Sequence, residues 1–175
     1  EALHRQALRL FEQKGDQRRI AHSIQNLAFA LRGQKKFAEA LAYHQQAIKL
    51  LEQVVDIHSL GIAHMNLGTT FASYLNKPAE ALLHYQQAEL IFKRLHDRLN
   101  IAKVNTGLGL GYLGVKEYKE AENAFLTSMR LFAELHDDSL RLNATDGLVM
   151  TYLAGGQYDQ ASQVAEQALR ELPKI

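Results

Sequence analysis

The chain has 175 residues, of which 47 % are hydrophobic and 22 % charged, a balance that predicts an ordinary folded domain. Its 20 basic and 19 acidic residues give a net charge of +1, which argues against nucleic-acid or membrane-surface binding because those partners select a basic face. Cysteine is absent, which excludes disulfides and thiolate zinc sites, and no apolar run approaches the roughly 18 residues of a membrane span. We therefore expect a cytoplasmic protein without membrane contact.

The first predicted element is a single helix over residues 1–14. Residues 1–8 match residues 41–48, which belong to the second helix of a later pair, so the expected partner of this first helix is missing. Repeat arrays normally close their ends with polar capping repeats, and the last helix, which contains Val164 and Leu169, has no polar face of that kind. We expect a fragment of a longer protein, with uncapped ends that could self-associate.

Residues 16–175 predict four pairs of helices. In the first pair, apolar residues recur at the 3.6-residue spacing of a helix over residues 20–31 and again over residues 37–51. The later pairs repeat this pattern, and no segment has the alternation typical of a strand. An aspartate precedes the first helix of each pair, where its side chain can cap free backbone N–H groups: Asp16, Asp56, Asp97 and Asp137.

Two markers define an internal repeat. The first is an alanine that recurs at steps of 41, 40 and 40 residues: Ala40, Ala81, Ala121 and Ala161. The second is a leucine followed in the first three repeats by a small residue: Leu27-Ala28, Leu67-Gly68 and Leu108-Gly109. A fixed period in this range indicates stacked repeat units, with small residues where paired helices approach closely. The extra residue of the first step is predicted to lie in the turn at residues 74–77.

These markers resemble the tetratricopeptide repeat. That family has a leucine and a small residue in its first helix, an aromatic residue four positions after the leucine, another aromatic residue just before the second helix, and an alanine three residues later. The third repeat supplies all of them: Leu108, Gly109, Tyr112, Tyr118 and Ala121. The resemblance implies an all-α, right-handed α-solenoid of antiparallel helix pairs in a single array, with a half repeat at residues 1–15 and repeats at residues 16–55, 56–96, 97–136 and 137–175.

The period of about 40 residues is longer than the family's commoner repeat of about 34. It resembles a long-repeat branch that includes sensor arms of maltose-activator-type bacterial regulators, peptide-pheromone receptors and polarity adaptors. The resemblance implies a non-enzymatic scaffold that recognises a protein or peptide partner. The alternative is a ligand-responsive regulatory arm of a bacterial signalling ATPase or transcription activator.

The resemblance also places the partner-binding site, because the first helices of the family's pairs line its concave face. Asn26 and Asn66 could bind a peptide backbone there, since an amide both donates and accepts, or could instead bond to neighbouring helices or water. The family's carboxylate clamp is not established by Arg32 and Lys103 alone. The aligned inward positions are Gln25, Asn26, Phe29, Arg32, Met65, Asn66, Thr69, Lys103, Thr106, Leu110, Asp146 and Met150.

Metal, nucleotide and catalytic sites are not expected. The histidines fall at equivalent repeat positions, His4 with His44 and His96 with His136, which indicates packing or linker roles. No His-Glu-x-x-His pattern is present, so we expect no metal site and no cofactor. The glycines within residues 107–111 follow no predicted strand, which a phosphate-binding loop requires.

Overall fold

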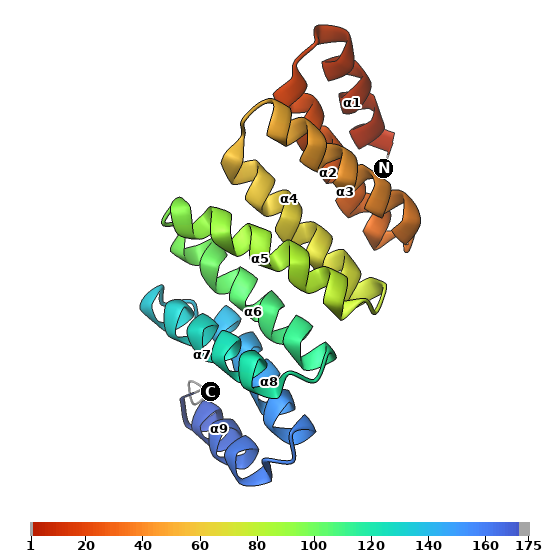
Figure 1. Ribbon diagram of the computed structural model, residues 1–175. Coiled ribbons are helices and arrows are strands. Elements are labelled where there is room, and N and C mark those ends of the chain that lie inside the picture. The colour runs from red at the N-terminus through yellow and green to blue at the C-terminus, as the bar shows by residue number, and fades with distance from the viewer. Residues whose placement is uncertain (1, 172–175) are drawn as a thin grey trace. The chain divides into compact units, whose positions relative to one another are not determined.

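The structure is a computed structural model that describes residues 2–171, and these residues form helices and short turns without a strand (Figure 1). The predicted fold class, an all-α array of antiparallel helix pairs, is confirmed. Among the described residues, no helix is long and apolar enough to cross a membrane. The elements are α1 (Ala2–Lys14), α2 (Gln17–Gly33), α3 (Phe37–Gln53), α4 (Ile57–Thr69), η1 (Thr70–Tyr74), α5 (Pro78–Arg94), α6 (Arg98–Gly114), α7 (Tyr118–Glu134), α8 (Asp138–Ala154) and α9 (Tyr158–Glu171).

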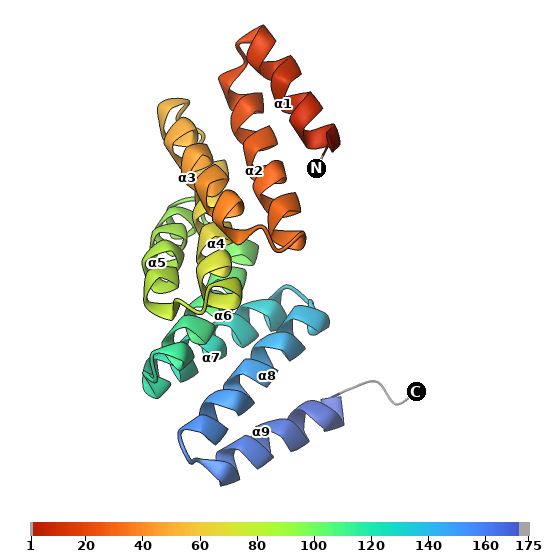
Figure 2. The same ribbon diagram turned by 90° about the vertical axis from the view of Figure 1, so that its right-hand side faces the viewer.

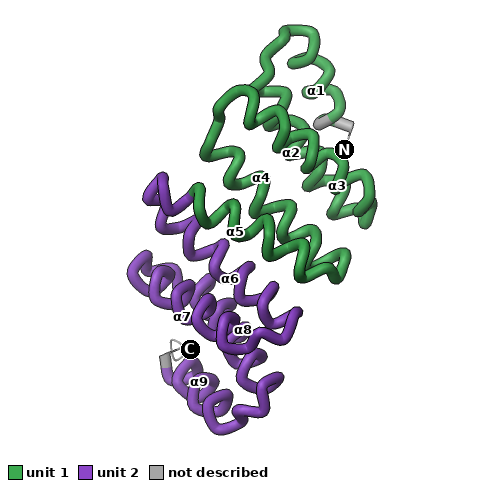
Figure 3. Tube along the Cα trace, viewed as in Figure 1, with its two compact units in different colours: residues 1–91 green, residues 92–175 purple. Residues whose placement is uncertain are grey.

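The chain divides into two compact units, residues 1–91 and 92–175, with the division inside α5 (Figure 3). In unit 1, α2 packs against both α1 and α3, and α3 also contacts α4. Figures 1 and 2 show α1 and α2 as neighbouring antiparallel helices. In unit 2, α7 packs against α6 and α8, and α8 also contacts α9. We call α2, α4, α6 and α8 the leading helices, and α3, α5, α7 and α9 the following helices. The repeat boundaries stay a prediction.

The four aspartates act as helix caps, as the sequence predicts. Each accepts a hydrogen bond at Oδ1 from the backbone N–H three residues later, at 3.0–3.2 Å. Such a cap stabilises a helix by about 1 kcal/mol. The leading helices α2, α4, α6 and α8 therefore begin at fixed points, set by Asp16, Asp56, Asp97 and Asp137.

The turns between helices depend on left-handed backbone. Each of the eight turns among the described residues contains one residue with φ between 51° and 75°, a conformation that favours glycine. Only Gly15 and Gly156 supply it, and Val55 adopts it with a β-branched side chain. His96 and His136 also occupy this position, which agrees with their predicted linker role. The other three residues are Lys35, Asn76 and Lys116.

Small residues allow the helices to approach closely, also as predicted. A Cβ atom built on Gly109 would lie 2.7 Å from the Phe125 ring, and one on Gly68 would lie 2.9 Å from the Tyr85 ring. The marker alanines are buried: Ala40, Ala81, Ala121 and Ala161. Larger side chains would overpack these contacts.

The extra residue of the second repeat is accommodated inside a helix, so its prediction in the turn at residues 74–77 is wrong. The turns at residues 34–36, 75–77, 115–117 and 155–157 all have the same length. Instead, η1 continues α4 as a π-helical segment, in which the Leu75 N–H donates to the Thr70 carbonyl at 3.2 Å. A π-helical turn has one residue more than an α-helical turn, and it therefore absorbs the insertion.

Candidate partner-binding faces

The leading helices of unit 1 are joined by side chains near their first turns. Gln25 of α2 is buried, and its Nε2 donates to the Ser59 carbonyl of α4 at 3.1 Å. His22 and Arg18 lie 3.4 Å and 3.7 Å from Asp56 Oδ2 at the start of α4. Gln25, which the alignment places among the inward residues, therefore uses its amide to hold α2 against α4.

The other predicted residues of unit 1 differ in accessibility. Asn26 is exposed, Phe29 is 60 % exposed, and Met65 and Asn66 are half-buried. Thr69 accepts a hydrogen bond from the Tyr85 hydroxyl at 3.2 Å and donates to the Met65 carbonyl at 3.0 Å. The accessible predicted surface of unit 1 therefore centres on Phe29 and the residues around it.

Arg32 lies between two aromatic rings in unit 1. Its guanidinium carbon is 4.8 Å from the centre of the Phe29 ring and 5.3 Å from the centre of the Tyr74 ring. The Tyr74 ring in turn lies 5.2 Å from the Phe37 ring. Tyr74 is the last residue of η1, and the sequence prediction did not include it. The 41-residue step was the available signal, because an insertion at this point shifts the residues that follow it.

His44 of α3 occupies an aromatic position in the repeat. It lies four residues after Ala40, as Tyr85 follows Ala81 and Phe125 follows Ala121. Its side chain is fully buried, and neither ring nitrogen has a hydrogen-bond partner. Burial, together with the nearby charge of Arg32, lowers the pKa of His44 to about 4. The ring is therefore neutral at pH 7 and fills space as an aromatic side chain would, in agreement with its predicted packing role.

A second histidine contact joins α4 to α5. His64 Nδ1 and His84 Nδ1 lie 3.1 Å apart, so one neutral ring donates to the other. The Phe71 ring of η1 stacks on His84 at 5.5 Å. Burial lowers the pKa of both histidines, and the His84 charge contributes to the pKa of about 4 at His64. No group of three or more potential metal-ligating side chains occurs in residues 2–171.

The leading helices of unit 2, α6 and α8, contact each other and present apolar side chains. Leu110 is 41 % exposed and Met150 is 57 % exposed. Asp146 is exposed and Lys103 is half-buried. Thr106 lies 2.7 Å from the Ser128 hydroxyl of α7, which itself donates to the Ala102 carbonyl at 2.9 Å. Thr106 therefore takes part in the α6–α7 contact.

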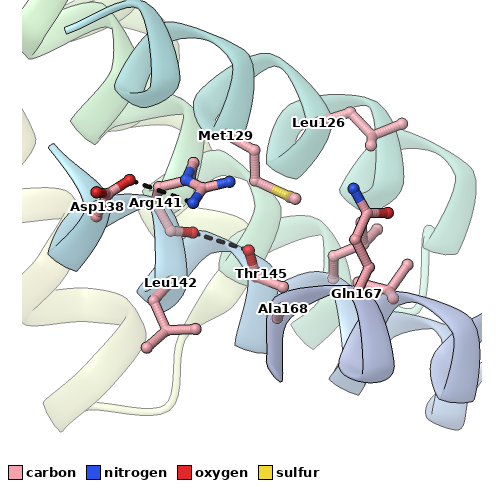
Figure 4. A pocket seen from close by; sticks show the side chains of 10 residues that line it. Leu126, Met129, Asp138, Arg141, Leu142, Thr145, Gln167 and Ala168 are labelled. Atoms are coloured by element: carbon pink, nitrogen blue, oxygen red, sulfur yellow. Dashed lines mark hydrogen bonds and ion pairs between the residues drawn. The ribbon is translucent and has the colours of Figure 1, made fainter. Parts of the chain in front are cut away.

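Unit 2 also contains a cavity of about 290 Å³, which the sequence prediction missed (Figure 4). Arg141 and Asp138 form an ion pair at its edge, 3.2 Å apart. Leu142 and Ala168 stand 40 residues after Ala102 and Ser128, so the hydrogen bond that joins those two residues has no counterpart here. Its apolar wall resembles core in sequence, which hides it. The lining residues come from α7, α8 and α9: Leu126, Met129, Asp138, Arg141, Leu142, Thr145, Leu148, Val164, Gln167 and Ala168.

Comparison with known families and structures gives consistent matches. The tetratricopeptide repeat model matches residues 18–94 and 100–170. The crystal structure of BtubC from P. vanneervenii superposes with a TM-score of 0.87 at 20 % identity, over 99 % of this chain and 75 % of that one. A putative kinesin light chain from Podosopora anserina with nearly identical repeats, solved as a Q17M variant, gives 0.81 at 18 % identity, over 97 % of this chain and 83 % of that one. At these identities the likeness concerns the fold alone.

A curated relative matches over a shorter stretch. The protein O-mannosyl-transferase Tmtc3 of Drosophila melanogaster is 35 % identical over 112 residues. The match covers 61 % of this chain but only 11 % of the transferase. The chain thus spans about a tenth of that relative.

Proposed function

Because the chain belongs to the tetratricopeptide repeat family, we propose that its leading helices bind a segment of a protein partner. Repeats of this family generally mediate protein–protein interaction. The proposal extends that general role to particular surfaces: the α2 and α4 face around Phe29 in unit 1, and the α6 and α8 face around Leu110 and Met150 in unit 2.

The exposed apolar residues at one repeat position carry this proposal. Phe29, Leu110 and Met150 occupy equivalent places on α2, α6 and α8, and each leaves a large apolar side chain accessible to solvent. Apolar side chains gathered on a face usually mark an interaction surface, where a few of them contribute most of the binding energy. The remaining repeat supplies Thr69, whose hydroxyl is used within the unit.

Peptides selected from a random display library with the full chain provide a test. Phe29→Ala or Leu110→Ala should weaken the selected peptides at least tenfold, because truncating a hot-spot residue costs about 2 kcal/mol. The matched controls are Leu83→Ala on α5 and Leu169→Ala on α9, which remove equally exposed leucines from following helices. Normal binding by both leading-helix variants, with loss in the control variants, would assign the interaction to the following helices.

The cavity of unit 2 supports a second candidate function, a response to a small ligand. Its volume of about 290 Å³ is near the lower limit for small-molecule sites, and its wall combines apolar side chains with the polar Arg141, Thr145 and Gln167. A thermal-shift screen of metabolites against the full chain would test this function. A stabilising compound should lose its effect in Ala168→Met, which fills the cavity, and a compound that stabilises this variant equally binds elsewhere.

A further inference from the structure

Arg32 differs from the other half-buried arginines of the described chain. Arg5 pairs with Glu39 at 3.7 Å, and Arg141 pairs with Asp138 at 3.2 Å. Arg32 forms no ion pair with a described residue, and its Nη1 is buried without a hydrogen-bond partner. Its printed contacts are the rings of Phe29 and Tyr74. A guanidinium that is partly removed from water normally gains a carboxylate partner, because an uncompensated charge is costly there.

Arg19 of the same unit shows what Arg32 lacks. The Arg19 guanidinium lies 5.6 Å from the centre of the Phe11 ring, and its Nε lies 3.3 Å from Asp16 Oδ2. Arg19 therefore combines an aromatic contact with a carboxylate. Arg32 has two aromatic contacts, which cover the faces of the guanidinium and leave its N–H edge for an acceptor.

The positive charge of Arg32 reaches other groups of unit 1. It lowers the pKa of His44, after burial, and it opposes the rise in the pKa of Tyr85 that burial produces. The site therefore has a positive potential that no described carboxylate beside Arg32 neutralises. Next to it, the Phe29 and Tyr74 rings remain 60 % and 44 % exposed, so an apolar group can bind beside an anionic one.

We infer that the partner segment bound by unit 1 carries an acidic residue beside an apolar one, and that the carboxylate contacts the Arg32 guanidinium between the Phe29 and Tyr74 rings. The inference rests on the proposed function and specifies the chemistry of the partner. The complementary charge argues for this occupant, and the π-helical segment that positions Tyr74 completes the site. Charge-assisted contacts of this kind fix the register of a bound segment.

A double-mutant cycle tests the inference. Peptides selected from a random display library on the full chain are measured by calorimetry in their Glu or Asp form and in the matching Gln or Asn form, against the unmodified chain and Arg32→Met. Methionine keeps an apolar stem between the two rings and removes the charge. The acidic peptide should lose at least fivefold in affinity on either change alone, and little more when both changes are made. Arg19→Met is the control, and there the two losses should multiply.

The outcomes separate the two proposals. If the chain selects no peptide, the proposed function fails and this inference fails with it. If peptides bind, but carry no acidic residue or lose equal affinity to the Gln change with and without Arg32, the inference alone is overturned. Circular dichroism checks that Arg32→Met is folded. If it is not, Arg32→Lys replaces it, and an acidic peptide whose affinity is unchanged by loss of the planar guanidinium overturns the inference.

Discussion

Phe125 of α7 lies directly against Gly147 of α8, where a Cβ atom on the glycine would come within 2.3 Å of the ring. The same ring faces Gly109 of α6, so one aromatic side chain fills the space between two leading helices. This contact explains why the repeat combines an aromatic residue with small residues on both sides. In unit 1, Tyr85 occupies the equivalent position and faces Gly68.

Gly147→Ala should therefore destabilise the chain by about 1–3 kcal/mol, the usual cost of overpacking a tight contact. Gly33→Ala is the matched control, because a Cβ there meets nothing within 4 Å and alanine favours the helix. Urea titrations followed by circular dichroism give both free energies of unfolding. Equal stability of the two variants would show that the α7–α8 contact relaxes freely around a methyl group.

His44→Phe should stabilise unit 1 and reduce its sensitivity to acid. The pKa of His44 is about 4 in the folded chain and about 6.5 when unfolded, so protons bind preferentially to the unfolded state. Stability is complete above about pH 6.5 and falls as the pH decreases toward 4, by about 3 kcal/mol from this residue. Phenylalanine fits because Phe125 occupies the equivalent place. Unfolding titrations at pH 7.5 and 5 should show a smaller difference for His44→Phe than for the original chain, and an unchanged difference would contradict this assignment.

Val55→Asn should stabilise the chain by about 1 kcal/mol, because a β-branched residue is strained at the observed φ of 55° whereas asparagine tolerates it. The side chain is 69 % exposed, so little packing is lost. The control, Val54→Asn, changes the neighbouring residue, which packs against the cluster of Ala21, Leu51 and Ala63. That variant should be less stable, and a thermal melt that ranks the two in the opposite order refutes the strain at Val55.

The helices, their caps and the small-residue contacts could be predicted because they depend on local spacing and on repetition. Asp56 caps α4 by the same short-range geometry as Asp16 caps α2. The place of the extra residue could not be predicted, because the repeat steps only locate it between Leu67 and Ala81. Whether a turn or a helix absorbs it depends on backbone hydrogen bonds such as that from Leu75 to Thr70.

The candidate site was predicted in part. Repeat alignment identified Phe29, Leu110 and Met150, which are exposed, but it also included Gln25, which is buried. The role of Gln25 depends on the Ser59 carbonyl, 34 residues away, and no local pattern reports such a contact. The aromatic contact between Arg32 and Tyr74 was missed for the same reason. Self-association through the ends of the array stays a prediction.

Photo-crosslinking with a selected peptide tests the central claim most directly. A peptide that carries benzoylphenylalanine in place of its apolar anchor is irradiated with the full chain, and mass spectrometry locates the crosslinked residues. Binding by the leading helices predicts crosslinks near Phe29 or Met65 in unit 1, or near Leu110 or Met150 in unit 2. Crosslinks confined to the following helices α3, α5, α7 and α9 would contradict the claim.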